Sequence, residues 1–235
     1  MKQNNSIKAQ IVYIKGHSES EKQAQECLKS FNNFNWNAHL HEGLTADIIE
    51  NEPEFNYTII ENSRLHDFKK ENYHKFLTKV SCAINHIRFW RKVVETNETM
   101  AFIEHDSICT TSWDSYIFDE YLILNCEFVF RPPNKLGLVQ YKDYNWPSFG
   151  LCSWPTNYPL KYHKENKWKN SNMAPGTAAY AITPEGAKKM LTAVEKYGLD
   201  QSDFMINSFY LKMQYCIPSP IKFNKTNLST SYGTL

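Results

Sequence analysis

The spacing of apolar and polar positions predicts strands and helices in alternation from the start of the chain. A short apolar run at residues 10–14 predicts a buried strand, and apolar positions at helical spacing over residues 20–31 predict an amphipathic helix. Residues 37–41 predict a second short strand. A strand, a helix and a strand in this order form a βαβ unit, whose ligands gather at the carboxyl ends of its strands.

A stronger helix signal follows a polar stretch over residues 44–70, where we expect loops and short helical turns. Apolar residues recur at three- and four-residue spacing over residues 76–94, so one face of this predicted helix packs on a sheet. The run at residues 100–107 then predicts a buried strand that ends in acidic residues. Helix, short turn and buried strand in this order indicate an α/β fold with a mostly parallel sheet.

The rest of the chain continues the alternation around one irregular stretch. Thr183 and Pro184 suit the N-cap and first position of a helix, and Gly198 suits its C-cap. The elements predicted here are a helix at 113–125, strands at 127–130 and 136–140, a long aromatic-rich surface excursion at 141–175, a strand at 176–183, a helix at 183–198, a helix at 199–210, a last strand at 213–217 and a loosely held tail from 224.

Composition narrows the class of protein. The 235 residues are 42% hydrophobic and 22% charged, which predicts one globular domain over residues 1–235. The formal net charge of +1 provides no bulk attraction to a polyanion. No apolar run is long enough for a signal peptide or a membrane span, so we expect a cytoplasmic protein. Six scattered cysteines without a Cys-x-x-Cys pair indicate neither a zinc site nor a disulfide framework.

Glu104 and Asp106 are the first candidates for chemistry, because they follow a buried strand directly. Hard cations such as Mn²⁺ and Mg²⁺ prefer carboxylate oxygens and keep open positions for phosphate oxygens. The alternative is a polar turn with both carboxylates in water. Tyr13 and the loop at residues 15–18 end the first strand and point to a binding crevice, although Tyr13 also suits a half-buried strand position.

Aromatic residues and lysines alternate over residues 141–175, a pattern that suits sugar faces and also unstacked nucleobases. The alternative is a structural loop that packs these aromatic rings on the core. His86, within the long predicted helix, suits a hydrogen-bonded structural role when considered without outside information.

Four segments in this order resemble glycosyltransferase family 25, which includes lipooligosaccharide sugar transferases and collagen galactosyltransferases. The first is the helical segment ending in SCAINHIRFWR at residues 81–91, with Asn85 where the family usually has Ser. The second is MAFIEHDS at residues 100–107, with His105 in place of the middle Asp of a Glu-Asp-Asp motif. The others are GTAAYAIT at residues 176–183 with the helix after it, and Asp203 at the position of a family Asp.

The resemblance implies a GT-A type fold and a nucleotide-sugar donor, which we expect to be a UDP-hexose. It implies Mn²⁺ or Mg²⁺ held by Asp106, with Glu104 acting through water or contacting the donor ribose. The family is regarded as inverting, which implies a general base. The resemblance implies Asp203 as the base and Asp200 as the fallback, and the structural alternative for Asp203 is an N-cap. The implied donor or diphosphate contacts are His86, Arg88, Gly176 and Thr177, beside Tyr13 and Glu104.

The acceptor is expected to be a hydroxyl of a cell-surface oligosaccharide, as in lipopolysaccharide biosynthesis. A modified base in DNA is the alternative acceptor, suggested by the aromatic and lysine-bearing excursion. A non-catalytic sugar-binding or nucleotide-binding protein is a further alternative, in which His105 marks the decay of the metal site.

Overall fold

A computed structural model describes residues 7–113, 116–125, 150–153, 168 and 177–224. Within these residues seven strands form one sheet in the order β2-β1-β3-β7-β5-β8-β6. Their bounds are β1 Lys8–Tyr13, β2 Asn37–Glu42, β3 Met100–Glu104, β5 Tyr121–Ile123, β6 Gly150–Ser153, β7 Ala179–Ile182 and β8 Met213–Ile217. The sheet is mixed and mostly parallel, because β7 and β6 alone among these strands run against the others.

The predicted βαβ unit is confirmed. The helix α1 (Ser18–Asn33) connects β1 to β2, and the two strands pair in parallel, with Lys8 opposite Asn37 and Tyr13 opposite Glu42. On its other side β1 pairs in parallel with β3, with Val12 opposite Glu104. The carboxyl ends of β1, β2 and β3 therefore meet at one edge of the sheet, which we call the carboxyl edge.

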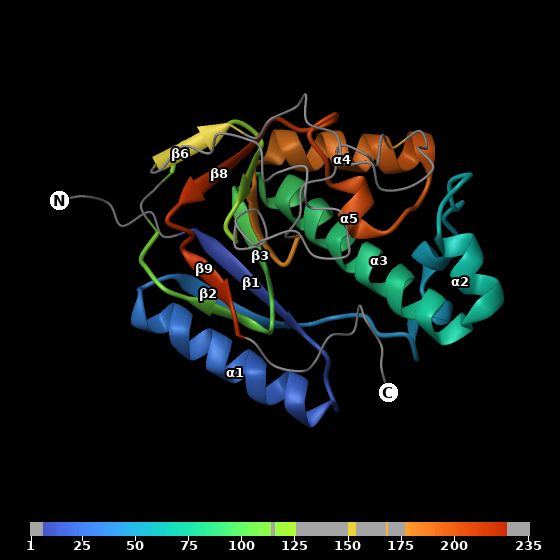
Figure 1. Cartoon of the computed structure of the whole chain (residues 1–235), viewed down its shortest axis with the longest axis horizontal. Helices are drawn as coiled ribbons and strands as arrows, with labels where there is room; N and C mark the ends of the chain where they lie inside the picture. Colours follow the sequence, from blue (N-terminus) through green and yellow to red (C-terminus); the bar gives the residue numbers. More distant parts are fainter. Residues whose placement is uncertain (1–6, 114–115, 126–149, 154–167, 169–176, 225–235) are drawn as a thin grey trace, which may run out of the picture.

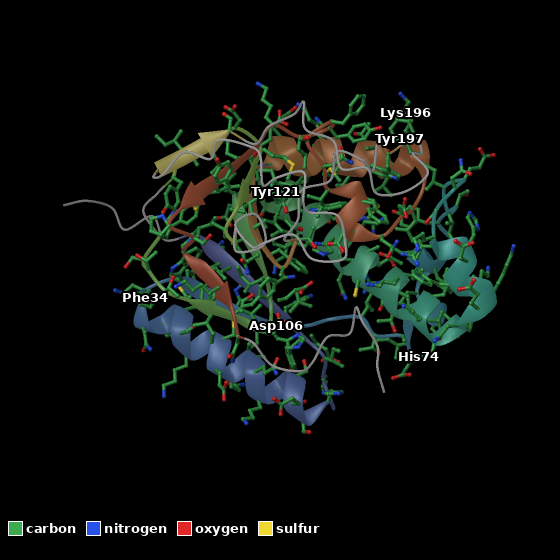
Figure 2. The ribbon with its side chains drawn as sticks, in the orientation of Figure 1. Phe34, His74, Asp106, Tyr121, Lys196 and Tyr197 are labelled. Carbon is green, nitrogen blue, oxygen red and sulfur yellow. The ribbon has the colours of Figure 1, made fainter. Side chains whose placement is uncertain are left out.

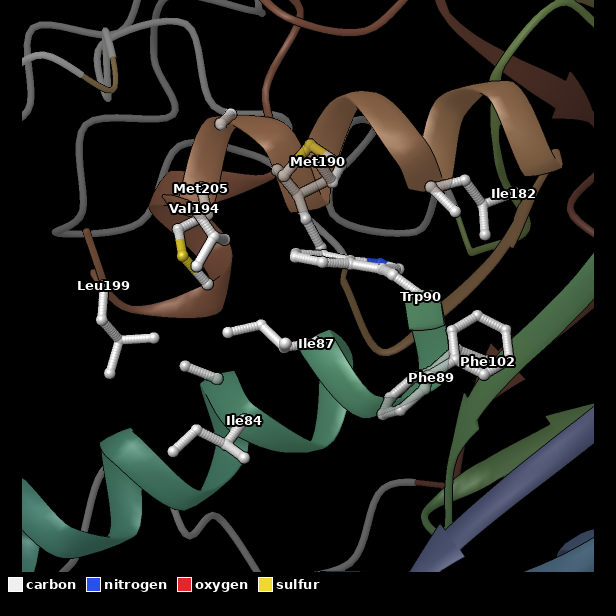
Figure 3. Packing of buried hydrophobic residues seen from close by; sticks show 14 of the residues in the cluster. Ile84, Ile87, Phe89, Trp90, Phe102, Ile182, Met190, Val194, Leu199 and Met205 are labelled. Atoms are coloured by element: carbon white, nitrogen blue, oxygen red, sulfur yellow. The ribbon is translucent and has the colours of Figure 1, made fainter. Parts of the chain in front are cut away.

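Helices cover both faces of the sheet (Figure 1). α1 lies on one face, and α3 (Tyr73–Thr96) and α4 (Pro184–Tyr197) lie on the other. Alternate residues of β3 enter the two cores, as a two-residue period requires: Met100 and Phe102 face α3, whereas Ala101 and Ile103 face α1. The first core is the larger, and in it the Trp90 side chain projects from α3 towards Met190 of α4 (Figure 3).

Local signals account for the helix ends. Thr183 caps α4 by accepting a hydrogen bond from the Gly186 backbone, and Pro184 occupies the first helical position, as predicted. Gly198 ends α4 at φ +91°, and its N–H donates to the Val194 carbonyl. α3 begins at the N-cap Asn72, whose side chain accepts from Lys75 N, and ends at Asn97 in the left-handed region.

Short elements connect the main ones. The polar stretch contains short helical turns as expected, η1 (Ile49–Asn51) and η2 (Pro53–Asn56), followed by the helix α2 (Leu65–Glu71). The strand β4 (Ser107–Cys109) follows β3 closely and pairs antiparallel with β9 (Ile221–Phe223). The strand β8 is therefore not the last one, which corrects the prediction for residues 213–217.

The helix predicted at residues 113–125 is wrong. The described part of this stretch contains β5, which lies in the sheet between β7 and β8. All three residues of β5 are buried, since both faces of the sheet are covered there. A short apolar run with no exposed face gives no periodicity to separate a strand from a helix.

The helix predicted at residues 199–210 is much shorter than expected, because α5 spans only Ser202–Met205. Asn207 is fully buried and its side-chain amide donates to the carbonyls of Phe204 and Trp168, so side-chain bonds replace helical ones. Within the aromatic excursion, residues 150–153 form β6 and Trp168 is fully buried. The strands predicted at 127–130 and 136–140, the rest of the excursion and nearly all of the tail lie outside the described residues.

Candidate active site

The carboxyl edge brings three of the predicted site residues together: Glu104, Thr177 and Asp203. Glu104 ends β3, and its backbone N–H donates to the Ala178 carbonyl at 2.7 Å. Ala178 follows Thr177 and leads into β7, which runs antiparallel to β3, so the start of β7 lies where β3 ends. The Thr177 hydroxyl in turn donates to Asp203 Oδ1 at 2.6 Å. Topology thus joins Glu104 to Asp203, which lies almost a hundred residues further along the chain.

The electrostatics show that three carboxylates share this edge. Burial raises the pKa of Glu104, and the negative charges of Asp106 and Asp203 raise it further. Burial also raises the pKa of Asp106. Carboxylates held close together in a partly dry site resist simultaneous ionisation, so a bound cation would lower the free energy of the charged state.

Asp106 has an unsatisfied oxygen. Asp106 is labelled in Figure 2, and its Oδ1 is buried without a hydrogen-bond partner among the described residues. Its backbone carbonyl accepts from Asn224 N, just after β9. A buried carboxylate oxygen without a donor is destabilising unless something outside the chain binds it. The arrangement therefore fits a cation or a donor group of a ligand at this oxygen.

A divalent ion fits this edge only if most of its ligands are not protein atoms. Within the described residues no group of three or more His, Cys, Asp or Glu side chains is arranged to hold a metal ion. Mg²⁺ in nucleotide sites is commonly held by one or two carboxylates, with water and phosphate oxygens completing the shell. Asp106 and Glu104 are the two carboxylates that could meet that smaller requirement, and the Oδ1 atom of Asp106 has no hydrogen-bond partner among the described residues.

His105 interacts with β1 while its neighbours in sequence belong to the carboxylate group. Burial lowers the pKa of its imidazole, and a hydrogen bond to the Val12 backbone opposes that shift. Its ring is thus associated with the end of β1. The replacement of the family's middle acid by His105 leaves both flanking carboxylates in place.

Tyr13 and the loop after it lie at the same edge, as predicted. Tyr13 is the half-buried last residue of β1, and its carbonyl accepts from Gly43 N just after β2. His17 caps α1, with Nδ1 accepting from Ser20 N. The loop at residues 15–18 therefore connects the end of β1 to the amino end of α1, where backbone N–H groups favour negative charge.

Two predicted donor contacts have other partners. His86 is 2% exposed, its Nδ1 lies 2.8 Å from the Tyr180 hydroxyl, and burial lowers its pKa to about 3. Arg88 binds the carboxylates of Glu52 and Glu54, the latter at 2.8 Å. Both residues therefore have partners within the chain, and their roles as donor or diphosphate contacts stay predictions.

Asp200, the fallback base, is fully buried and accepts hydrogen bonds from Ser63 Oγ at 2.6 Å and from Gln201 N at 2.8 Å. Asp203 does not cap α5, because the N-cap position is Gln201, and it lies in the first turn with its side chain on Thr177. The geometry favours Asp203 over Asp200 as the more exposed carboxylate. Gly176 lies outside the described residues.

Residues of α3 near this edge were not predicted from the sequence. Lys79 and Cys82 both lie within electrostatic range of Glu104, and Cys82 also of Asp203. Asn85 binds both backbone polar groups of Leu44, with Oδ1 accepting from N at 2.8 Å and Nδ2 donating to O at 3.0 Å. The sequence shows only that Lys79 and Cys82 share the helix face of His86, seven and four residues before it, because their level along β3 depends on tertiary packing.

A surface hollow of about 570 Å³ lies at the opposite end of the strands. Lys8, Asn37 and Thr99 line it at or just before the starts of β1, β2 and β3, together with Trp113 and Tyr116. The carboxylates lie at the other ends of the same strands. The candidate chemistry is thus separate from this hollow.

The comparison with protein families decides between the classes of function. Residues 10–206 match the family described as glycosyltransferase family 25 (LPS biosynthesis protein). The chain belongs to glycosyltransferase family 25. This assignment confirms the resemblance found in the sequence, the GT-A type fold and the expectation of an enzyme that transfers a sugar.

Family 25 membership implies a sugar donor and an acceptor, and GT-A glycosyltransferases commonly use a divalent metal ion. The search of curated proteins found no match to this family 25 chain. None of the helices in the described ranges combines the length and the apolar character that crossing a membrane requires.

Proposed function

We propose that this family 25 glycosyltransferase moves a hexose from a UDP-sugar to a hydroxyl of a cell-surface oligosaccharide, with inversion at the sugar carbon. The observation that supports the proposal most is the unsatisfied Oδ1 of Asp106 within a group of three carboxylates at the carboxyl edge. Ligands of open α/β sheets bind at such an edge.

Asp203 is the proposed general base. Its Oδ1 accepts from the Thr177 hydroxyl, and this bond fixes the carboxylate while leaving Oδ2 for the acceptor. In a single displacement the acceptor oxygen forms the bond to the anomeric carbon as the bond to the diphosphate breaks. The electron pair of the broken bond stays on the diphosphate, and the hydroxyl proton passes to Asp203.

Asp106 and Glu104 would hold Mn²⁺ or Mg²⁺. When bound, such an ion neutralises the charge of the departing diphosphate as a Lewis acid. Burial raises the pKa of Glu104, so the chain itself disfavours three ionised carboxylates at this edge. The Oδ1 atom of Asp106 would be the first ligand, and Glu104 at the end of β3 would contact the ion through water or hold the donor ribose.

The donor side of the site would be built from Tyr13 and the backbone that follows β2. Tyr13 ends β1, and Gly43 follows β2 with its N–H on the Tyr13 carbonyl. A Cβ at Gly43 would lie 2.7 Å from Val12 Cγ1 and 3.3 Å from Asn85 Nδ2, so no larger residue fits this close approach. The turn that carries Leu44 is fixed by Asn85, so the backbone next to Tyr13 is held in place.

The test is a panel of nucleotide sugars read by donor hydrolysis and by the shift in melting temperature. We expect a UDP-hexose to raise the melting temperature, because a ligand that binds only the folded state stabilises it by mass action. The hydrolysis should require Mn²⁺ or Mg²⁺. Absence of both binding and hydrolysis for every nucleotide sugar would contradict the proposal.

The acceptor is tested with the donor identified in that panel. Transfer to lipooligosaccharide fragments is expected, and product stereochemistry by NMR should show inversion. A DNA acceptor would instead require oligonucleotide binding that weakens as salt rises, because phosphate contacts release counterions. Transfer to a modified oligonucleotide and none to glycans would replace the acceptor stated here.

A further inference from the structure

Lys79 is a cation without a partner beside the carboxylates. It is half-buried on α3, and it has no hydrogen bond or ion pair within the part of the chain that the structure describes. The other cations of α3 differ in this respect. Arg88 and Arg91 bind Glu54, Lys92 donates to Gln10, and Lys75 lies 4.8 Å above the Phe68 ring.

The packing of α3 on the sheet gives the position of Lys79. The ring centroids of His86 on α3 and Phe102 on β3 are 4.1 Å apart, which fixes the register of the helix against the strand. α3 is joined to β3 by a short turn and runs back along it, so earlier residues of the helix lie nearer the carboxyl edge. Lys79 precedes His86 by two turns, about 10 Å, on the same helix face.

The strand covers a similar length in the same direction. Glu104 lies two residues beyond Phe102, which corresponds to about 7 Å of extended chain, and the turn at residues 105–106 follows it directly. Lys79 is therefore roughly level with the end of β3 and the turn that carries Asp106. The electrostatics agree, because the charge of Lys79 opposes the effect of burial on the pKa of both Glu104 and Cys82.

A cation beside these carboxylates would add to the attraction that a divalent ion exerts on a diphosphate. Glu104, Asp106 and Asp203 bring three carboxylates, and a nucleoside diphosphate brings further negative charge. Among the described residues Lys79 is the cation that acts on Glu104. An ammonium group on a flexible stem is well suited to bind phosphate oxygens.

We propose that Lys79 binds the diphosphate of the nucleotide donor and stabilises the charge that remains on it when the sugar leaves. This inference rests on the proposed function. Lys79 keeps its protons throughout: the electron pair of the broken bond goes to the terminal phosphate oxygen, and the acceptor proton goes to Asp203. The residue is thus a contact of the leaving group.

The test compares the affinity for UDP with that for uridine by titration calorimetry, in buffer with EDTA and again with Mn²⁺. The wild-type enzyme should prefer UDP. Lys79→Gln should weaken UDP binding about tenfold, as expected for one hydrogen bond to a charged group, and leave uridine binding unchanged. Lys79→Arg keeps the charge and should retain most of the preference for UDP.

Lys75→Gln is the matched control, because it removes the same charge from the same helix one turn away, and it should bind UDP as the wild type does. An unchanged ratio of UDP to uridine affinity in Lys79→Gln would overturn the role of Lys79 and leave the proposed function standing. No binding of UDP or other nucleoside diphosphates to the wild type would overturn both. Melting temperatures of each variant establish that the compared proteins are folded.

Discussion

The Nδ1 atom of His86 lies 2.8 Å from the hydroxyl oxygen of Tyr180, which joins α3 to β7 in the core. The same hydroxyl oxygen accepts from Trp90 Nε1 at 3.1 Å. Because burial keeps the imidazole neutral by lowering its pKa, the Tyr180 proton is available for Nδ1. One hydroxyl therefore satisfies two buried polar groups of α3, and this bond holds the helix that carries Lys79 against the strands.

Tyr180→Phe should lower the free energy of unfolding by about 1–3 kcal/mol, because it leaves Trp90 Nε1 and His86 Nδ1 buried without a partner. Urea denaturation followed by tryptophan fluorescence measures the change. The ring itself, which stacks on Phe102 at 5.5 Å, is kept in the variant. A midpoint equal to that of the wild type would contradict the role of this hydroxyl.

The stability of the enzyme should fall with acid in a way that depends on His86. Burial lowers its pKa to about 3, below the value of about 6.5 in an unfolded chain. The unfolded state therefore binds more protons below pH 6.5, and the contribution is complete above that pH and lost as the pH falls towards 3. Tyr180, Trp90 and Phe102 face the ring, and none of them is charged.

His86→Gln isolates this effect, because every other titrating group is common to both proteins. The loss of unfolding free energy between pH 7 and pH 5 should be about 2 kcal/mol larger in the wild type than in the variant. Denaturant titrations at both pH values give the comparison. Equal losses in the two proteins would show that His86 is not held neutral by burial.

Asp203→Asn should mainly lower turnover, whereas Asp200→Asn should mainly lower stability. The amide oxygen of the Asp203→Asn variant still accepts from Thr177 but takes no proton, so kcat should fall by about 10²–10⁴ with little change in stability. Asp200→Asn weakens two bonds to a fully buried carboxylate and should lower stability by about 1–2 kcal/mol. Enzyme assays and urea denaturation of both variants give the comparison. Lost turnover with unchanged stability in Asp200→Asn alone would make Asp200 the base.

Gly198→Ala should destabilise the enzyme more than Gly16→Ala. Both glycines have positive φ, +91° and +80°, so alanine is strained at either position. A Cβ at Gly198 would lie 2.3 Å from the Thr58 carbonyl oxygen, whereas a Cβ at Gly16 has no neighbour within 4 Å. Thermal unfolding should show a difference of at least about 1 kcal/mol. Equal effects would mean that the Thr58 backbone yields.

The sequence predicted the helices that carry local signals. The apolar stripe of α3 and the capping residues of α4 are local signals, and both helices were placed within a few residues. β5 was missed because it is only three residues long and buried on both faces, so its short apolar run does not separate a strand from a helix. α5 was overestimated because the side-chain bonds of Asn207 that end it come from tertiary structure.

The sequence predicted the part of the site in which acidic residues directly follow a buried strand. Glu104 and Asp106 follow a buried strand, and a parallel sheet places such residues at its edge. The position of a residue in a motif could not show that Arg88 forms a salt bridge with Glu54, or that His86 lies in the core. It also could not show Lys79 opposite the acids, because that depends on the register of α3 against β3.

The most direct test of the proposed chemistry is the Mn²⁺ dependence of donor hydrolysis in Asp106→Asn beside the wild type. We expect the wild type to hydrolyse its UDP-sugar with saturable Mn²⁺ dependence, and the variant to lose at least about a hundredfold in rate while folding as well as the wild type. The free Oδ1 of Asp106 is the reason that its stability should not fall. A folded Asp106→Asn enzyme with the metal dependence and rate of the wild type would contradict the metal and diphosphate site at the end of β3.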